Sequence, residues 1–334
     1  MPFVEKLLGY KSISFVGMEK NAGKTQTLNY VLNRLRTFSN LKLAISSIGI
    51  DGEQVDQVTE TAKPEITIYK GTKFVTAQAL YSQKEIIADI ESVSRQTTAL
   101  GRLITARAIS TGKVLLAGPS GSEQMKRLID TLSSEVDLCL IDGALSRMSF
   151  GSPCITDAMI LSTGAAVSAS LPTMVSKTRF IYDLTQLPKY QGDEIESLKQ
   201  KEKGIFALSE GKVIELEVPS LLMIDRYKDK IFEHGKRIYI SGVLNEKFMQ
   251  FLCTQKDLNT IEIVIKDFTK NFASSDSIYR FLNRGGKLSV LHPTNLIAIT
   301  ANPISPSGYH FNNEQMLEAL SQAIPTEIYN IKTL

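Results

Sequence analysis

The stretch ISFVGMEKNAGKT, residues 13–25, indicates the fold of this chain more clearly than any other. An apolar strand over 12–16 runs into a glycine-containing turn. A helix is then predicted from about Gly23 to Arg36, because apolar residues recur at positions 28, 31, 32 and 35. The backbone N–H groups of such a turn, together with the helix N-terminus, bind phosphate. The sequence therefore predicts a phosphate-binding loop between the first strand and the first helix.

The residue types in this loop predict a Mg-dependent nucleotide site. Lys24 would reach the β- and γ-phosphates, and the Thr25 hydroxyl would bind Mg²⁺. The loop is one residue longer than the strict pattern, because Met18 stands where the first glycine is expected and Gly17 precedes it. We expect the following residues to hold the nucleotide: Gly17, Glu19, Lys20, Asn21, Ala22, Gly23, Lys24, Thr25 and Gln26.

Acidic residues that follow two other predicted strands are the candidate metal ligands. The run VDLCLIDG, residues 136–143, is an apolar strand that ends in Asp142, and Gly143 would let the backbone turn close to the phosphates. Asp51 follows a strand predicted over 41–48; it either assists the metal or activates water, and the alternative is that it only forms a turn with Gly52. The predicted catalytic residues are Lys24, Asp51 and Asp142, and the predicted metal ligands are Thr25, Asp142 and Asp51.

The rest of the chain alternates short apolar runs with amphipathic stretches, a pattern typical of an α/β fold with a mostly parallel sheet and flanking helices. Two helices are predicted over 84–95 and 99–110, and a third over 123–132, capped by Ser120 and Glu123. From about residue 190 the composition becomes more polar, and a β-hairpin is predicted. We therefore expect a nucleotide-binding core over 1–190, a β-containing insertion over 191–290, and a strand-helix-strand segment over 291–334 that completes the core.

Composition excludes several classes of function. The 334 residues are 43% hydrophobic and 22% charged, with 38 Lys and Arg against 35 Asp and Glu, and no dense basic run indicates nucleic-acid binding. No apolar run approaches the ~20 residues that span a bilayer. The start of the chain does not resemble a signal peptide, and the three cysteines form neither a metal motif nor a disulfide framework. We expect a cytoplasmic protein with buried thiols.

With these motifs in place, the N-terminal half resembles the dethiobiotin synthetase-like branch of P-loop NTPases. The loop over 17–25 has the same length as in that branch, and Asp142-Gly143 matches its acidic strand end. The segment TANPISP, residues 300–306, is similar to a strand whose asparagine meets the adenine, so the resemblance implies that Asn302 contacts the base; the alternative is a Pro-rich surface turn. The synthetase's substrate lysine is replaced here by Ser46 and Ser47. Biotin-pathway chemistry is therefore not implied.

A closer similarity is to the reactivase group of lysine 5,6-aminomutase, a cobalamin- and pyridoxal phosphate-dependent enzyme. It rests on residues 17–25, 47–53 and 141–144. This resemblance implies that ATP and Mg²⁺ drive the exchange of damaged cofactor on a protein partner, either the aminomutase or a second reactivase subunit. It also implies a possible homodimer, which is common in the branch.

Two main functions follow from the motifs. One is a regulatory ATPase, in which Asp51 and Arg147 couple the nucleotide to a protein partner. The other is a small-molecule kinase or ATP-dependent ligase, whose substrate would lie against residues 146–153. The missing substrate lysine favours the regulatory ATPase. A third hypothesis is that the protein is only a scaffold and that its loop is a relic with no function. No guanine-recognition motif of the Asn-Lys-x-Asp type is found, which favours ATP over GTP.

Overall fold

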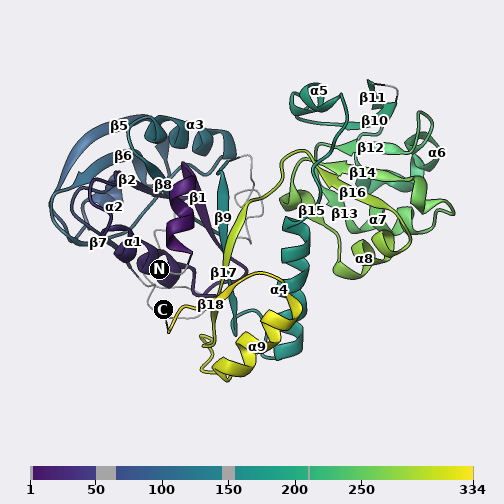
Figure 1. Ribbon diagram of the computed structural model, residues 1–334. Helices are drawn as coiled ribbons and strands as arrows, with labels where there is room; N and C mark the ends of the chain where they lie inside the picture. Colours follow the sequence, from purple (N-terminus) through teal and green to yellow (C-terminus); the bar gives the residue numbers. More distant parts are fainter. Residues whose placement is uncertain (1–2, 50–64, 145–154, 210, 334) are drawn as a thin grey trace. The chain divides into compact units, whose positions relative to one another are not determined.

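The computed structural model describes residues 3–49, 65–144, 155–209 and 211–333 and divides the chain into two compact units, shown in Figure 1. Unit 1 comprises Met1–Arg179 and Asn295–Leu334, and unit 2 comprises Phe180–Thr294. The sequence predicts boundaries after residues 190 and 290. The segments beside these positions belong to unit 2, because the Tyr190 N–H donates to the Val290 carbonyl and the His292 N–H donates to the Lys266 carbonyl.

Among the described residues, unit 1 contains a nine-stranded sheet, and the predicted α/β class is confirmed. Seven neighbouring strands, from β18 to β4, are parallel, and β6 and β5 extend the sheet antiparallel at one edge. In spatial order the strands are β18 (Ile328–Asn330), β17 (Leu296–Asn302), β9 (Ala158–Gly164), β1 (Ser12–Gly17), β8 (Leu138–Ala144), β2 (Leu43–Ser47), β4 (Lys73–Ala77), β6 (Gly101–Ala108) and β5 (Ala88–Thr98).

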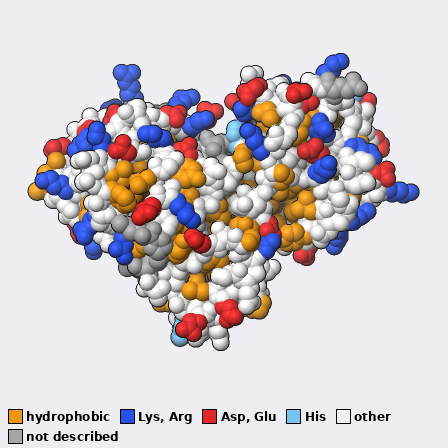
Figure 2. All heavy atoms as spheres, in the orientation of Figure 1, with side chains coloured by type: hydrophobic (Ala, Val, Ile, Leu, Met, Phe, Trp, Pro, Cys, Tyr) orange, Lys and Arg blue, Asp and Glu red, His pale blue; other side chains and the backbone are white. Residues whose placement is uncertain are grey.

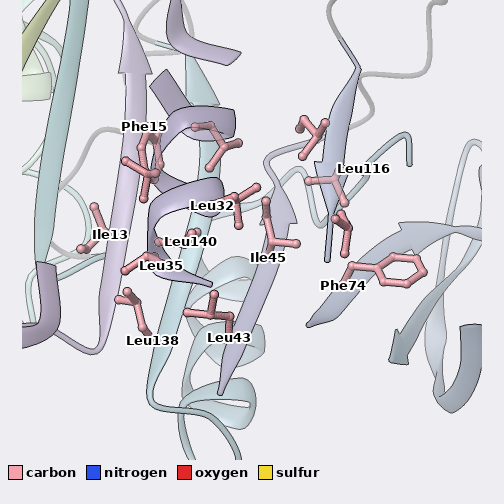
Figure 3. Close-up of a cluster of buried hydrophobic side chains, with 14 of the residues drawn as sticks. Ile13, Phe15, Leu32, Leu35, Leu43, Ile45, Phe74, Leu116, Leu138 and Leu140 are labelled. Atoms are coloured by element: carbon pink, nitrogen blue, oxygen red, sulfur yellow. The ribbon is translucent and has the colours of Figure 1, made fainter. Parts of the chain in front are cut away.

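Helices cover both faces of this sheet, because alternate strand residues point to opposite sides. In β8, Leu138 and Leu140 pack in the cluster under α1 (Lys24–Leu35), whereas Ile141 packs with α3 (Ser122–Ser133) on the other face. Figure 3 shows the α1 side of the core. Strands β1, β2 and β9 are buried along their whole length and mostly apolar, which is why the sequence pattern identifies them well.

The prediction of helices over 84–95 and 99–110 is wrong. Most of these residues form the antiparallel hairpin of β5 (Ala88–Thr98) and β6 (Gly101–Ala108). Their apolar residues fit a helical spacing, but Ile, Val and Thr are frequent here and favour strands. Gly101 adopts φ +93°, a turn conformation that a continuous helix does not allow. The hairpin adds the antiparallel edge to the sheet.

The third predicted helix is confirmed as α3, but its predicted cap is wrong. The N-cap residue is Gly121, which makes no side-chain hydrogen bond, so Ser120 and Glu123 do not form a capping box. The remaining elements of unit 1 are η1 (Val4–Gly9), β3 (Ile66–Ile68), α2 (Gln78–Tyr81), β7 (Gly112–Val114) and α9 (Asn313–Ala323), while α4 (Leu171–Thr185) runs across the boundary between the units.

Unit 2 has a separate mixed sheet of five strands among its described residues. The predicted hairpin is present as β10 and β11, and β12, β14 and β16 are parallel. The spatial order is β11 (Lys212–Leu216), β10 (Ile205–Ser209), β12 (Arg237–Ile240), β14 (Glu262–Ile265) and β16 (Lys287–Val290). The other elements are α5 (Ile195–Lys199), η3 (Leu221–Arg226), α6 (Lys228–Ile231), β13 (Leu244–Asn245), α7 (Glu246–Cys253), η4 (Leu258–Thr260), η5 (Phe268–Lys270), β15 (Asn271–Phe272) and α8 (Ser275–Asn283).

The surface carries charges of both signs (Figure 2), and the described cysteines are free thiols. Figure 2 shows Lys and Arg side chains interspersed with Asp and Glu on the visible face of unit 1. Among the described residues no helix has both the length and the apolar character needed to cross a membrane. Cys139 is buried and Cys253 partly buried, both as free thiols, and burial raises the pKa of each. Cys154 lies outside the described residues.

Candidate functional site

The predicted phosphate loop is the turn between β1 and α1. Gly17 is the last residue of β1, and Lys24 is the first residue of α1. Asn21 and Gly23 have left-handed backbone, with φ of 63° and 96°. A side chain at position 23 would also bring its Cβ to 3.0 Å from the Cβ of Asn302. The turn therefore depends on the glycine that precedes the lysine.

The end of α1 that meets the loop is suited to an anion. Its N-cap, Gly23, offers no side chain to the first turn, and that turn contains no acidic residue. The first N–H groups of a helix have no intrahelical partners, and the N-terminus carries a partial positive charge. The loop is also fastened in place, because the Met18 N–H donates to the Ser162 carbonyl of β9 at 2.9 Å. A phosphate group would meet backbone donors that are already positioned.

Lys24 and Asp142 meet at the carboxyl edge of the sheet. Strands β1 and β8 are adjacent, with Phe15 beside Asp142 in the register. The Nζ of Lys24 lies 2.8 Å from the Oδ1 of Asp142. The Asp142 side chain is 6% exposed and the Lys24 side chain 17%, so the pair is largely shielded from water. The structure thus brings together the cation and the carboxylate that the sequence predicts for one site.

Two buried polar atoms near Lys24 in the sequence, the Nδ2 of Asn21 and the Oε1 of Gln26, have no hydrogen-bond partner among the described residues. Leaving such a group unsatisfied costs about 1–3 kcal/mol. A bound phosphate would accept a hydrogen bond from the Asn21 amide, and a donor such as a metal-bound water would satisfy Gln26. These two atoms, and the pairing of an ammonium with a carboxylate, fit the donor and acceptor set of a Mg–nucleotide complex.

Asn302 lies against the loop, as its predicted place in the site requires. Its Nδ2 donates to the Asn21 carbonyl at 3.1 Å, and its Oδ1 accepts from the Ile304 N–H at 3.2 Å. Gly164 permits this arrangement, because a Cβ at that position would lie 1.9 Å from the Asn302 carbonyl oxygen. Asn302 therefore holds the loop in shape, and contact with the base stays a prediction.

A cluster of buried hydroxyl groups under the loop is not predicted from the sequence. The Thr27 Oγ1 lies 2.8 Å from the Thr300 Oγ1, which lies 2.9 Å from the Ser162 Oγ. Thr27 also donates to the Gly23 carbonyl at 3.1 Å. The cluster links α1 to β9 and β17, and these hydroxyls satisfy one another in a site closed to water. Their separation along the chain leaves no local signal in the sequence.

The remaining predicted site residues differ in where they lie. Glu19 and Lys20 lie on the exposed side of the loop, and Ala22 is buried. Ser47 lies beside Asp142 in the pairing of β2 with β8, and the next residue donates its N–H to the Asp142 carbonyl at 3.0 Å. Asp51 and Arg147 both lie outside the described residues. Their proposed roles stay predictions.

No group of three or more His, Cys, Asp or Glu side chains that could hold a metal occurs among the residues that the structure describes. A metal held by the phosphate loop would instead be shared with the nucleotide phosphates, so it does not need such a group. Comparison of the chain with protein-family models, with curated proteins and with solved structures finds no match in any of the three.

Proposed function

We propose that this chain binds ATP with Mg²⁺ and hydrolyses it. The observation that carries the proposal is the Lys24–Asp142 ion pair at 2.8 Å, formed where the phosphate loop meets the end of the neighbouring strand. A shielded ion pair between two residues is weak evidence for stability alone, because desolvation offsets much of its attraction. The pair contains the lysine that directly follows the loop, and the buried Asn21 amide of that loop has no partner among the described residues; both observations support a role in binding an anion.

Each residue has a distinct task in this proposal. The N-terminus of α1 and the loop N–H groups bind the phosphates, and Lys24 leaves Asp142 to neutralise the terminal phosphate oxygens. Thr25 and Asp142 would hold Mg²⁺, with Asp51 as a further candidate. The metal would supply charge neutralisation between the phosphates during transfer of the terminal phosphoryl group to water. Asn302 keeps the loop in its binding shape and is the candidate contact to adenine.

The hydrolysis would serve regulation. The resemblance to the lysine 5,6-aminomutase reactivase group, within the dethiobiotin synthetase-like P-loop branch, supports a partner that carries cobalamin. Ser46 and Ser47 at the end of β2 support this proposal over ligase chemistry, because the synthetase places a substrate lysine there. Hydrolysis would then change the contacts of this chain with the partner rather than modify a small substrate.

The first experiment measures Mg-dependent ATP hydrolysis by the purified protein. We expect slow basal turnover that is lost in Lys24→Ala. The matched control is Lys42→Ala, which removes an exposed lysine at the opposite end of β2 from the site. Equal turnover in wild type and Lys24→Ala would assign the activity to a contaminant and contradict the proposal.

The second experiment tests the partner. Lysine 5,6-aminomutase inactivated by turnover is incubated with ATP, fresh cobalamin and this protein, and recovery of aminomutase activity is followed. We expect recovery with wild type and none with Lys24→Ala. ATP hydrolysis without any recovery would overturn the reactivase role and leave the ATPase proposal standing.

A further inference from the structure

We propose that a recess on the α3 side of unit 1 binds a linear zwitterion, a molecule with an ammonium group and a carboxylate at opposite ends of an aliphatic chain. The recess has a volume of about 370 Å³, in the range of small-molecule sites. It lies between α3 and the antiparallel strands β5 and β6. None of its lining residues belongs to the proposed nucleotide site.

One wall of the recess is a single stripe of α3. Gln124, Leu128 and Thr131 follow one another at three- to four-residue spacing, which places them on the same helix face. Residues 91–94 of β5 form the opposite wall, and Val75 and Leu103 contribute to the apolar lining. In Figure 1, α3 and β5 lie at the same end of unit 1. The recess therefore follows the length of α3.

At the end near the last turn of α3, two carboxylates pair with two cations and one carboxylate oxygen is left over. Glu135 and Glu91, from opposite walls, both bind the Nζ of the buried Lys73. Arg107 also pairs with Glu91, and although burial alone would raise the pKa of Glu91, the hydrogen bonds from Lys73 and Arg107 hold it below its usual value. Glu135 uses one oxygen for Lys73, and its Oε1 makes no hydrogen bond to any described residue. That oxygen is available to an ammonium group.

The other end carries a positive charge. The Arg127 side chain is 75% exposed, and its ion pair with Glu123 is long, at 3.6 Å. An exposed pair of this kind contributes little energy, so the guanidinium can turn to a carboxylate in the recess. Arg127 lies roughly 9 Å along the helix from the end of α3 at Ser133, and Glu135 follows just beyond that end. A ligand that reaches both needs charges at its two ends.

The apolar part of the recess favours a ligand with an aliphatic chain. Leu103, Leu128, Leu132 and Val75 supply apolar lining. A methylene chain would cover these apolar side chains, and each CH₂ that it removes from water would favour its binding. Short amino acids would leave one charged end unpaired. The chemistry therefore points to an ω-amino acid with several methylene groups.

The test uses 6-aminohexanoate as the probe, with hexylamine, hexanoate and 4-aminobutanoate as comparison ligands, and calorimetry or ligand-observed NMR as the readout. We expect 6-aminohexanoate to bind at least about tenfold more tightly than each of the others, the effect of one lost charge-assisted hydrogen bond. Equal affinity for hexylamine and 6-aminohexanoate would overturn the two-ended site. Absence of saturable binding up to on the order of 10 mM would overturn the proposal entirely.

Variants locate the binding. Arg127→Gln should weaken 6-aminohexanoate about tenfold and leave hexylamine unchanged, whereas Lys126→Gln, an exposed neighbour outside the recess, should change neither. Glu135→Gln should weaken both amines. Because Glu135 also supports Lys73, Thr131→Trp provides a second variant that fills the recess from an exposed helix position. Binding that survives both Arg127→Gln and Thr131→Trp would contradict the site.

Discussion

Replacing Asp142 with Asn should strengthen the binding of ATP in the absence of Mg²⁺. In the ligand-free protein Lys24 is held by Asp142 at 2.8 Å, and ATP must separate the pair. At an effective dielectric constant of about 20 the direct attraction over this distance is about 6 kcal/mol, most of which is offset by desolvation. Coupling energies between contacting residues are about 0.5–3 kcal/mol. We therefore expect the substitution to make the free energy of ATP binding more favourable by about 1.4 kcal/mol, which corresponds to a tenfold lower Kd.

The assay is calorimetric titration of ATP in EDTA and again in excess Mg²⁺. Wild type should bind better with Mg²⁺, and Asp142→Asn should lose that gain because the metal carboxylate is gone. Asp137→Asn is the matched control, since Asp137 directly precedes β8 at the opposite edge of the sheet and accepts from the Lys42 N–H. If Asp142→Asn binds Mg-free ATP no better than wild type, the ion pair does not compete with the nucleotide. That result would contradict the prediction that Asp142 holds Lys24 back from ATP.

Three further predictions concern stability. Gly23→Ala should lower the free energy of unfolding by more than Gly71→Ala in urea titrations: both glycines have left-handed backbone, which costs about 1 kcal/mol for alanine, but only position 23 faces a close neighbour, Asn302. Thr27→Val should cost about 1–2 kcal/mol by the same measurement, because Ser162 and Thr300 lose a buried partner; no loss would mean that the hydroxyl cluster is not formed. The folded-state pKa of Glu91 lies below its ordinary 4.5, so its contribution is present above pH 4.5 and is lost as the pH falls through the lowered pKa. The protection of the β5 and β6 amides, which is their exchange rate relative to the intrinsic rate at the same pH, should therefore fall in acid, and this acid step should be absent in Glu91→Gln.

The central strands and the loop are predictable from the sequence because their signals are local. Strand β8 is apolar on both faces, since one set of side chains meets α1 and the other meets α3. The loop glycine and lysine follow a strand and open a helix, and the structure has that order. The Lys24–Asp142 pairing follows as soon as β1 and β8 are neighbours.

The hairpin of β5 and β6 is not predictable in the same way. It lies at the edge of the sheet, where polar residues such as Glu91 alternate irregularly with apolar ones because the pairing with β6 has two irregularities. The irregular spacing imitates a helical period. The contact between Asn302 and the loop joins residues 281 positions apart, so only the assembled sheet reveals it.

Whether the loop binds nucleotide is decided by measuring ATP binding to the purified wild-type protein and to Lys24→Ala, with Mg²⁺ present and GTP as the competitor. We predict saturable ATP binding that GTP displaces poorly, that Lys24→Ala loses and that Lys42→Ala keeps. Failure of the folded wild-type protein to bind either nucleotide would contradict the proposed phosphate site and leave the α/β fold without it.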